Sequence, residues 1–350
     1  MKVIVGMSGG VDSAVTAYLL KMQGYEVEGV TLRTIKSENE DGRSRDIEDA
    51  RQICETLGIP HHVRNCSSKF EYCVIDPFIQ AYSEGRTPNP CVICNRQVKF
   101  DELMSAIPVL KADYIATGHY AKIEKLPNGR YTVKNGASAL KDQSYMLCRL
   151  SQEQLAKTLF PLGDLTKDEV RKIAEDAGLH VAHKGESQDI CFANETDYAA
   201  FIEERTGQTF PEGDFVDTEG KVLGRHKGII NYTVGQRKGL GVAAGVPIFV
   251  KKIDAENNRV VLTEEEDMYA SGCVLKDVNY MGMPCPEDNE ELEARVKIRY
   301  HHQAVPAKVY RKGRELFVEF SEPVKAVAPG QTAVLYDEDG CVLAGGEIDR

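Results

Sequence analysis

The sequence contains no tryptophan, and aromatic residues make up only 7% of its 350 positions. It has no apolar run of the roughly 18 to 20 residues that a membrane-spanning helix needs. The segment from Met1 to Gly10 has a single lysine and too short an apolar stretch for a secretory signal. Apolar residues (42%) and charged residues (28%) are present in ordinary globular proportions, which excludes a disordered or fibrous chain. We therefore expect a cytoplasmic protein with no membrane partner.

Basic residues are outnumbered, and the net charge is −11, which argues against a surface that is basic throughout. The charge is nevertheless uneven. Residues Arg295 to Arg314 include seven Lys or Arg, two His and no acid, and Arg225 to Lys238 include four Lys or Arg and no acid. An acidic protein with such local stretches can hold a polyanion on one face. The alternative interpretation is that these two stretches are β-hairpins whose charges are simply solvated.

The ten cysteines lack the spacing of a disulfide framework, and we expect most of them to be buried as small apolar residues. Cys91 and Cys94 form a C-x-x-C pair, but no second pair exists to complete a structural zinc site. A zinc half-site and a redox pair remain the alternatives. We expect a helix to begin near Asn95, so that its amino end, Arg96 and Lys99 lower the pKa of both thiols.

The order of expected elements indicates the fold. In the first half, strands alternate with helices, which predicts βαβ units and a parallel sheet. Expected strands are 2–7, 26–32, 61–65 and 113–117, and expected helices are 11–23, 46–57 and 166–177, the last with a capping box from Thr166 and Glu169. Asn128-Gly129 predicts a hairpin within 120–134.

After about residue 194 the pattern changes to a helix over 197–205 and then to short strands separated by glycines. Short strands at regular spacing predict a small barrel or sandwich. We therefore expect an α/β fold with a doubly wound parallel sheet, then a small mixed central domain and a C-terminal β-barrel. The expected domains are 1–196, 197–270 and 271–350.

The loop from Gly6 to Ser13 connects the first expected strand to the first expected helix. Its glycines allow a sharp turn and close approach of a ligand, and the exposed N–H groups at a helix amino end favour an anion. Asp12 would repel a bare phosphate, so we infer a Mg²⁺ that bridges Asp12 and the phosphates of a nucleotide. The loop lacks the Walker lysine and the G-x-G-x-x-G pattern. A tight turn with a Ser or Asp cap is the alternative.

Residues 8–13, Ser-Gly-Gly-Val-Asp-Ser, resemble the pyrophosphate loop (PP-loop) of the ATP pyrophosphatase superfamily. Further motifs follow in order along nearly the whole chain and resemble those of tRNA-specific 2-thiouridylases. They are Gly85-Arg-Thr-Pro-Asn-Pro90, Cys94-Asn95 with Lys99-Phe100, Thr117-Gly-His-Tyr-Ala121, Lys141-Asp-Gln-Ser-Tyr145, Ser187-Gln-Asp-Ile-Cys-Phe192 and Gly235-Gln-Arg-Lys-Gly-Leu-Gly241.

This resemblance implies an ATP-dependent tRNA-uridine 2-sulfurtransferase with an adenine nucleotide hydrolase-like fold. Such an enzyme adenylates the 2-position oxygen of the wobble uridine of tRNA, and sulfur then displaces AMP. A cysteine desulfurase or a sulfur-relay protein would deliver the sulfur as a persulfide. Cys191 matches the cysteine that carries the persulfide, and Cys94 matches the nucleophile that releases the sulfur and ends in a Cys94–Cys191 disulfide.

The same resemblance implies three sets of binding residues. The ATP set is Gly6, Met7, Ser8, Gly9, Gly10, Val11, Asp12, Ser13, Leu32 and Gly118. The target-base set is Asn89, Pro90 and Cys91. The tRNA set is His119, Lys141, Asp142, Gln143, Arg299, Tyr300 and Gln331.

Position 91 departs from the family pattern, because many members carry Asp where this chain has Cys91. Together with Cys94 and Cys191 it would supply three thiolates, enough for a [4Fe–4S] cluster with one open iron. The disulfide route is our main hypothesis and the cluster is the alternative. Two other functions also remain open: an amide-forming synthetase of the same superfamily, and an RNA-binding protein that a nucleotide regulates.

Overall fold

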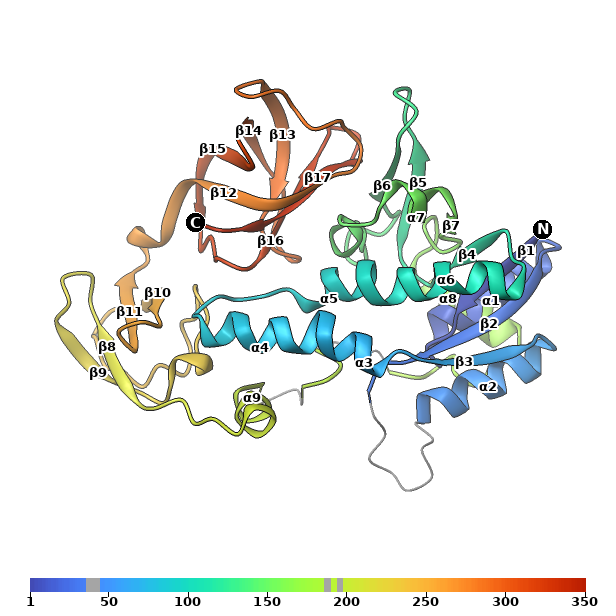
Figure 1. Ribbon diagram of the computed structural model, residues 1–350, viewed down its shortest axis with the longest axis horizontal. Coiled ribbons are helices and arrows are strands. Elements are labelled where there is room, and N and C mark those ends of the chain that lie inside the picture. The colour runs from blue at the N-terminus through green and yellow to red at the C-terminus, as the bar shows by residue number, and fades with distance from the viewer. Residues whose placement is uncertain (36–44, 186–189, 194–197) are drawn as a thin grey trace.

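The first part of the chain is built on a parallel sheet (Figure 1). The computed structural model describes residues 1–35, 45–185, 190–193 and 198–350. The strand order is β3-β2-β1-β4-β7, and every neighbouring pair is parallel. The strands are β1 (Lys2–Gly6), β2 (Glu26–Arg33), β3 (His61–Asn65), β4 (Tyr114–Ala116) and β7 (Thr158–Leu159). The order reverses between β1 and β4, and ligands bind outside the carboxyl ends of the strands at such a switch point.

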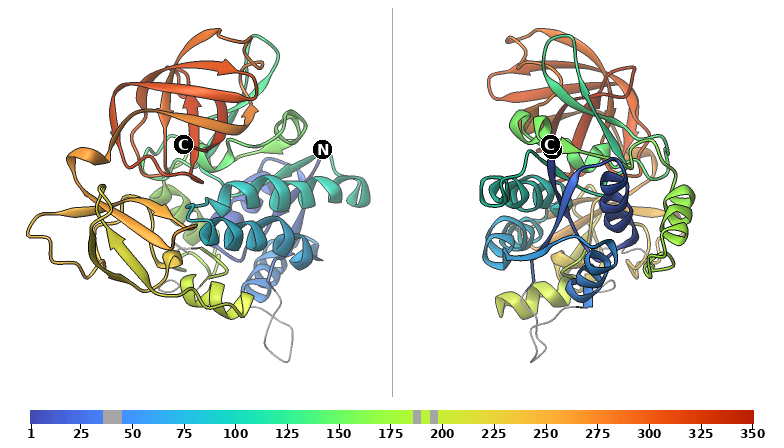
Figure 2. Two further views of the ribbon diagram at one scale, coloured as in Figure 1. Left: turned by 60° about the vertical axis from the view of Figure 1, so that its left-hand side comes forward. Right: turned by 90° about the vertical axis from the view of Figure 1, so that its right-hand side faces the viewer.

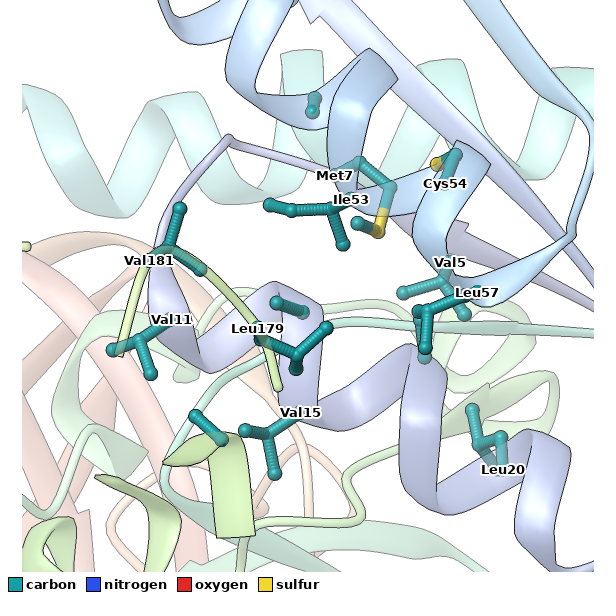
Figure 3. Packing of buried hydrophobic residues seen from close by; sticks show 14 of the residues in the cluster. Val5, Met7, Val11, Val15, Leu20, Ile53, Cys54, Leu57, Leu179 and Val181 are labelled. Atoms are coloured by element: carbon teal, nitrogen blue, oxygen red, sulfur yellow. The ribbon is translucent and has the colours of Figure 1, made fainter. Parts of the chain in front are cut away.

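Helices cover both faces of this sheet, as predicted. Val3 and Val5 of β1 are fully buried against α1 (Val11–Met22), α2 (Arg45–Leu57) and α8 (Lys167–Asp176). Figure 3 shows Val5 and Met7 facing side chains from α1 and α2. Ile4 points to the opposite face, where Leu103 of α6 (Asp101–Leu110) is buried in the same cluster. This alternation gives the strand its continuous apolar character.

The helical layer over the second face is nearly continuous from Pro90 to Leu110. It runs through α5 (Pro90–Ile93), the π-helical segment η2 (Cys94–Phe100) and α6. The expected start near Asn95 is therefore wrong, because the helix begins at Pro90, where the missing N–H of proline costs nothing. Alongside it lie α3 (Ser67–Phe70), the π-helical segment η1 (Glu71–Ile75) and α4 (Asp76–Ser83).

Local turn and cap signals are confirmed. The predicted hairpin forms from β5 (Ala121–Lys125) and β6 (Tyr131–Asn135), with Gly129 at φ +82° in its turn. The predicted capping box forms too, since Glu169 accepts from Thr166 N–H at 2.7 Å and donates its own N–H to Thr166 Oγ1 at 3.3 Å. The short elements η3 (Ser144–Leu147) and α7 (Gln152–Ala156) connect this hairpin to the sheet.

The second part of the chain is β-rich, as expected. Helix α9 (Tyr198–Thr206) precedes a four-stranded sheet of order β10-β11-β8-β9, and a closed barrel of order β12-β15-β14-β13-β16-β17 follows. The sheet consists of β8 (Gly213–Val216), β9 (Val222–His226), β10 (Ile248–Asp254) and β11 (Arg259–Glu264), with short 3₁₀ turns η4 (Ile229–Asn231) and η5 (Glu266–Met268). The barrel consists of β12 (Tyr269–Tyr280), β13 (Glu291–Lys297), β14 (Val305–Lys312), β15 (Glu315–Lys325), β16 (Thr332–Tyr336) and β17 (Val342–Ile348).

The barrel packs against the first part of the chain, as both views of Figure 2 show. Buried Val334 and Val342 of the barrel belong to the same cluster as Ile4 of β1. Tyr145 of η3 donates its hydroxyl to Thr332 O at 2.7 Å across this interface. No helix within the described ranges is both long and apolar enough to span a membrane.

Candidate active site at the carboxyl ends of the parallel strands

The glycine loop lies between β1 and α1, at the switch point of the sheet. Gly9 has φ +73°, and a Cβ there would lie 2.4 Å from Asp46 O. A Cβ at Gly118 would lie 2.8 Å from the carbonyl carbon of Asp12. Both positions therefore require glycine, and Gly118 lies directly against the loop that contains Gly9.

The amino end of α1 is open to an anion. Its N-cap is Gly10, and no side chain of the described residues caps it. Ser13 Oγ accepts from Ser8 N–H at 3.2 Å and donates to Gly10 O at 3.0 Å, which holds the loop in shape. Uncapped N–H groups at a helix amino end, with a close glycine loop and two hydroxyls, fit the phosphates of a nucleotide.

Asp12 contacts Lys167, which belongs to none of the quoted motifs, and Tyr120, which lies in the Thr117–Ala121 motif. Lys167 of α8 donates to Asp12 Oδ1 at 2.8 Å and to Oδ2 at 2.9 Å. Tyr120 donates its hydroxyl to Oδ1 at 2.7 Å. Lys167 occupies the first position of a helix, where the macrodipole disfavours a cation, and this is the one sequence signal that it has another role.

A second lysine ties the loop to α2. Lys184 Nζ donates to Gly9 O at 3.1 Å and pairs with Asp46 at 2.9 Å and Asp49 at 2.6 Å. Residues 186–189, which include part of the third cysteine motif, lie outside the described residues. The loop is thus bordered by two lysines, Lys167 and Lys184, from distant parts of the chain.

The predicted thiols lie in one neighbourhood. Burial raises the pKa of Cys94 to about 12, Lys99 lowers it, and the nearby thiols of Cys191 and Cys91 raise it further. Desolvation by surrounding protein raises the pKa of Cys191 and of Cys91, and Lys99 lowers both. Cys94 is 7% exposed, whereas Cys91 and Cys191 are exposed. The expectation that Cys91 and Cys94 have lowered pKa values is wrong in this conformation, because desolvation by the surrounding protein outweighs the effect of Lys99.

An aromatic cluster connects Cys191 to the Cys94 helix. Phe192 packs edge-on against Phe70 at 5.6 Å and Phe78 at 5.1 Å between ring centroids. The same apolar cluster contains buried Cys94 and is contacted by Leu32 of β2. Since β2 pairs with β1, which carries the glycine loop, the thiols and the loop lie at the same end of the sheet.

All ten cysteines are free thiols in this structure. Among the described residues, no group of three or more His, Cys, Asp or Glu is arranged to hold a metal ion. The arrangement of Cys91, Cys94 and Cys191 therefore lends no support to the [4Fe–4S] alternative. A Mg²⁺ at Asp12 would have one protein carboxylate and would depend on phosphate oxygens for its other ligands.

The target-base segment is held by the barrel. Gln331 Nε2 donates to Thr87 O at 3.0 Å and to Pro88 O at 3.4 Å, directly before Asn89 and Pro90. Gln331 was expected to contact tRNA, and here its amide positions this segment.

Of the other expected tRNA residues, some are held inside the protein and some reach the surface. Asp142 is buried and accepts from Ser144 Oγ at 2.7 Å, and Gln143 Oε1 accepts from Tyr120 N–H at 3.0 Å. Burial lowers the pKa of His119 to about 3, so that its ring is neutral at physiological pH. Arg299 is exposed, and Lys141 and Tyr300 are half-buried. The structure brings the 141–145 segment next to the 299–300 segment, since the Tyr145 and Tyr300 rings lie 6.0 Å apart.

Comparison with known proteins agrees with this architecture. The family described as "tRNA methyl transferase HUP domain" matches residues 1–195. A "tRNA methyl transferase PRC-barrel domain" matches residues 199–264, and an "Aminomethyltransferase beta-barrel domain" matches residues 270–348. Solved structures are more distant: a 4-thiouridine synthetase–RNA complex with bound ATP has a TM-score of 0.35 at 18% identity over 55% of this chain and 44% of that one, too little to support an argument.

Similarity to curated proteins extends over the full length. The chain is 48% identical to a tRNA-specific 2-thiouridylase MnmA of Lachnoclostridium phytofermentans, over 99% of each chain. It is 45% identical to the protein of the same name in Clostridioides difficile, over 100% of this chain and 98% of the relative. The chain therefore belongs to the tRNA-specific 2-thiouridylase family, as its motifs indicated.

Proposed function

We propose that this protein uses ATP to replace the 2-position oxygen of the wobble uridine of tRNA with sulfur. Its membership of a family whose members are named tRNA-specific 2-thiouridylases supports the proposal. The structural observation that carries it is the location of the glycine loop and of the Cys94–Cys191 neighbourhood at one end of the same parallel sheet.

In the first step, the uridine oxygen attacks the α-phosphorus of ATP, and the bond to pyrophosphate breaks. The loop N–H groups and the Lys167 ammonium are placed to stabilise the negative charge on the departing phosphates. Asp12 orients Lys167 and would be the protein ligand of a Mg²⁺ that binds the phosphates. Adenylation converts a poor leaving group into AMP.

In the second step, the terminal sulfur of a Cys191 persulfide attacks carbon 2, and AMP leaves. Cys94 then attacks the Cys191 sulfur, the S–S bond of the persulfide breaks, and the terminal sulfur stays on the base. The products are 2-thiouridine and a Cys94–Cys191 disulfide, which an external thiol reductant must reduce. A cysteine desulfurase or a relay protein would supply the persulfide to Cys191, whose exposed side chain suits this transfer.

We further propose the division into a catalytic domain (1–196) and two RNA-contacting domains (197–270 and 271–350), with the cytoplasm as the site of action. The expected contacts of Asn89, Pro90 and Cys91 with the target base belong to this proposal, as do those of Leu32 and Gly118 with the nucleotide.

The test is to incubate the protein with ATP, an unmodified tRNA transcript and a persulfide donor, then to measure AMP and 2-thiouridine by mass spectrometry. We expect AMP and 2-thiouridine in equal amounts, both dependent on tRNA. An amide-forming synthetase would release AMP without tRNA and would not need Cys94 or Cys191. A regulated RNA-binding protein would bind tRNA without releasing AMP.

A further inference from the structure

A cavity of about 320 Å³ lies where α4, residues 86–93 and the barrel meet. This volume is within the range of small-molecule sites, roughly 300 to 1,000 Å³. Asn89 and Pro90 line it, whereas Asp12, Cys94 and Cys191 are not among the residues that line it. It is therefore a space beside the proposed active site and separate from the thiols and the glycine loop.

The lining of the cavity combines two kinds of side chain. Its apolar residues include Val74, Phe78, Ala81, Pro90 and Ile93. It also contains three cations: Arg86, Arg149 and Lys276. A lining with both kinds of side chain suits a ligand with a flat apolar part and an anionic part.

Two of these cations already form ion pairs with carboxylates. Arg86 pairs with Glu347 at 2.8 Å, and Lys276 pairs with Asp349 at 2.9 Å and with Glu347 at 3.5 Å. Glu347, which also lines the cavity, is thus neutralised from two sides. Asp277 is the other acid in the lining and is exposed.

Arg149 differs from the other two. The residue is 8% exposed, and its buried Nε has no hydrogen-bond partner in the described part of the chain. No carboxylate of the described residues lies within ion-pair distance of it. Burying a guanidinium without an anionic partner costs free energy. A ligand that brought an anion to Arg149 would form the missing ion pair, and this would add to its binding free energy.

We propose that this cavity is a subsite for a nucleoside monophosphate unit, with the phosphate on Arg149 and the base against the apolar side chains of the lining. Arginine is the residue best suited to planar, multidentate recognition of phosphate. A base stacks on apolar and aromatic side chains without requiring a particular sequence. The inference rests on the proposed function, because Asn89 and Pro90 connect the cavity to the target-base segment. The unit can come from a nucleotide next to the target in single-stranded RNA, or from free AMP, which has the same chemistry.

The test compares Arg149→Met, which removes the charge, with Arg149→Lys, which keeps it. Exposed Arg51 on α2, outside the basic stretches and the proposed RNA-contacting domains, gives the charge-matched control Arg51→Met. Binding of an anticodon stem-loop RNA is measured over a range of salt concentrations. We expect Arg149→Met to weaken binding about 5- to 30-fold and to lower the salt slope by about one. Arg149→Lys should recover most of the affinity, and Arg51→Met should change it less than about twofold.

Two further arms identify the ligand. Stem-loops with an abasic site next to the target should lose affinity for the unchanged protein but not for Arg149→Met, which would assign the cavity to RNA. AMP is also titrated against RNA-free protein by calorimetry. Arg149-dependent AMP binding with unchanged RNA affinity would assign the cavity to the free nucleotide.

Ala81 also lines the cavity, so Ala81→Leu, which fills part of the space and retains Arg149, repeats the test if Arg149→Met fails to fold. Unchanged RNA and AMP binding in a folded Arg149→Met or Ala81→Leu protein would overturn the subsite. Failure of the unchanged protein to bind or thiolate tRNA would instead overturn the proposed function, so the two failures are distinguishable.

Discussion

Lys167 donates hydrogen bonds to both carboxylate oxygens of Asp12, at 2.8 and 2.9 Å, although 155 residues separate the two in sequence. The contact brings a cation from the start of α8 to the glycine loop at the end of β1. Because Lys167 is almost fully buried, this ammonium is held at one place beside the open end of α1. The loop thus has a fixed positive charge that its own sequence does not contain.

We predict that Lys167→Met lowers tRNA-dependent AMP formation about 100- to 1,000-fold, as expected when one preorganised charge is removed from a transition state. Asp12→Asn should lower it by a similar factor, because the loop then loses its metal ligand and the partner of Lys167. Both rates are measured as AMP release at saturating tRNA.

Lys172→Met is the matched control, since Lys172 is an exposed lysine on the same helix. Lys172→Met should form AMP at the rate of the unsubstituted protein. The affinity for tRNA should be the same in all three variants. Normal AMP formation by Lys167→Met would show that its contact with Asp12 is structural only.

We predict that Cys191→Ser forms AMP from ATP and tRNA but produces no 2-thiouridine, because serine cannot carry a persulfide. Cys285→Ser, at another exposed cysteine in the barrel region, should behave like the unchanged protein. Mass spectrometry of digested tRNA measures the product. Formation of 2-thiouridine by Cys191→Ser would contradict the role of this residue.

The thiol of Cys94 should react slowly and with a steep pH dependence. Burial raises its pKa to about 12, so the thiolate fraction, and with it the alkylation rate, should rise about tenfold for each pH unit from 7 to 10 without a plateau. Exposed Cys285 is the reference within the same molecule. Alkylation of Cys94 is followed by peptide mass spectrometry, and a rate that levels off by pH 10 would show that Cys94 has an ordinary or lowered pKa.

Arg299 is the exposed member of the expected tRNA set and is placed beside the Tyr145–Tyr300 pair. We predict that Arg299→Ala weakens tRNA binding and lowers the salt slope by about one, because one phosphate contact is lost. Filter binding at several salt concentrations measures both quantities. An unchanged slope would mean that Arg299 does not contact a phosphate.

Gln331 provides a different kind of test, because its amide holds the segment before Asn89 rather than facing solvent. We predict that Gln331→Ala increases hydrogen exchange at residues 87–93 and lowers the thiolation rate more than it lowers tRNA affinity. Gln331→Glu, which cannot donate to the same carbonyls, should have the same effects. Equal losses of rate and affinity without faster exchange would favour a direct tRNA contact.

Local patterns in the sequence were sufficient for much of this architecture. Short apolar strands that alternate with helical segments predicted the parallel sheet, and Thr166 with Glu169 predicted the capping box, because these features depend on neighbours a few residues apart. The glycine loop could be recognised for the same reason, since Gly9 and Asp12 lie within one turn of chain. The helix that begins at Pro90 rather than Asn95 shows where such reasoning is least exact.

The sequence by itself thus predicted the alternation of strands and helices, the glycine loop and which cysteines to propose for the chemistry. The tertiary structure alone decided that Lys167 reaches Asp12, that Cys94 is buried and its pKa raised, and that Arg149 lines a cavity against the barrel. These properties depend on desolvation and on charges brought together from distant segments. Neither can be calculated from spacing along the chain, because both arise only when the sheet, its helices and the barrel have packed.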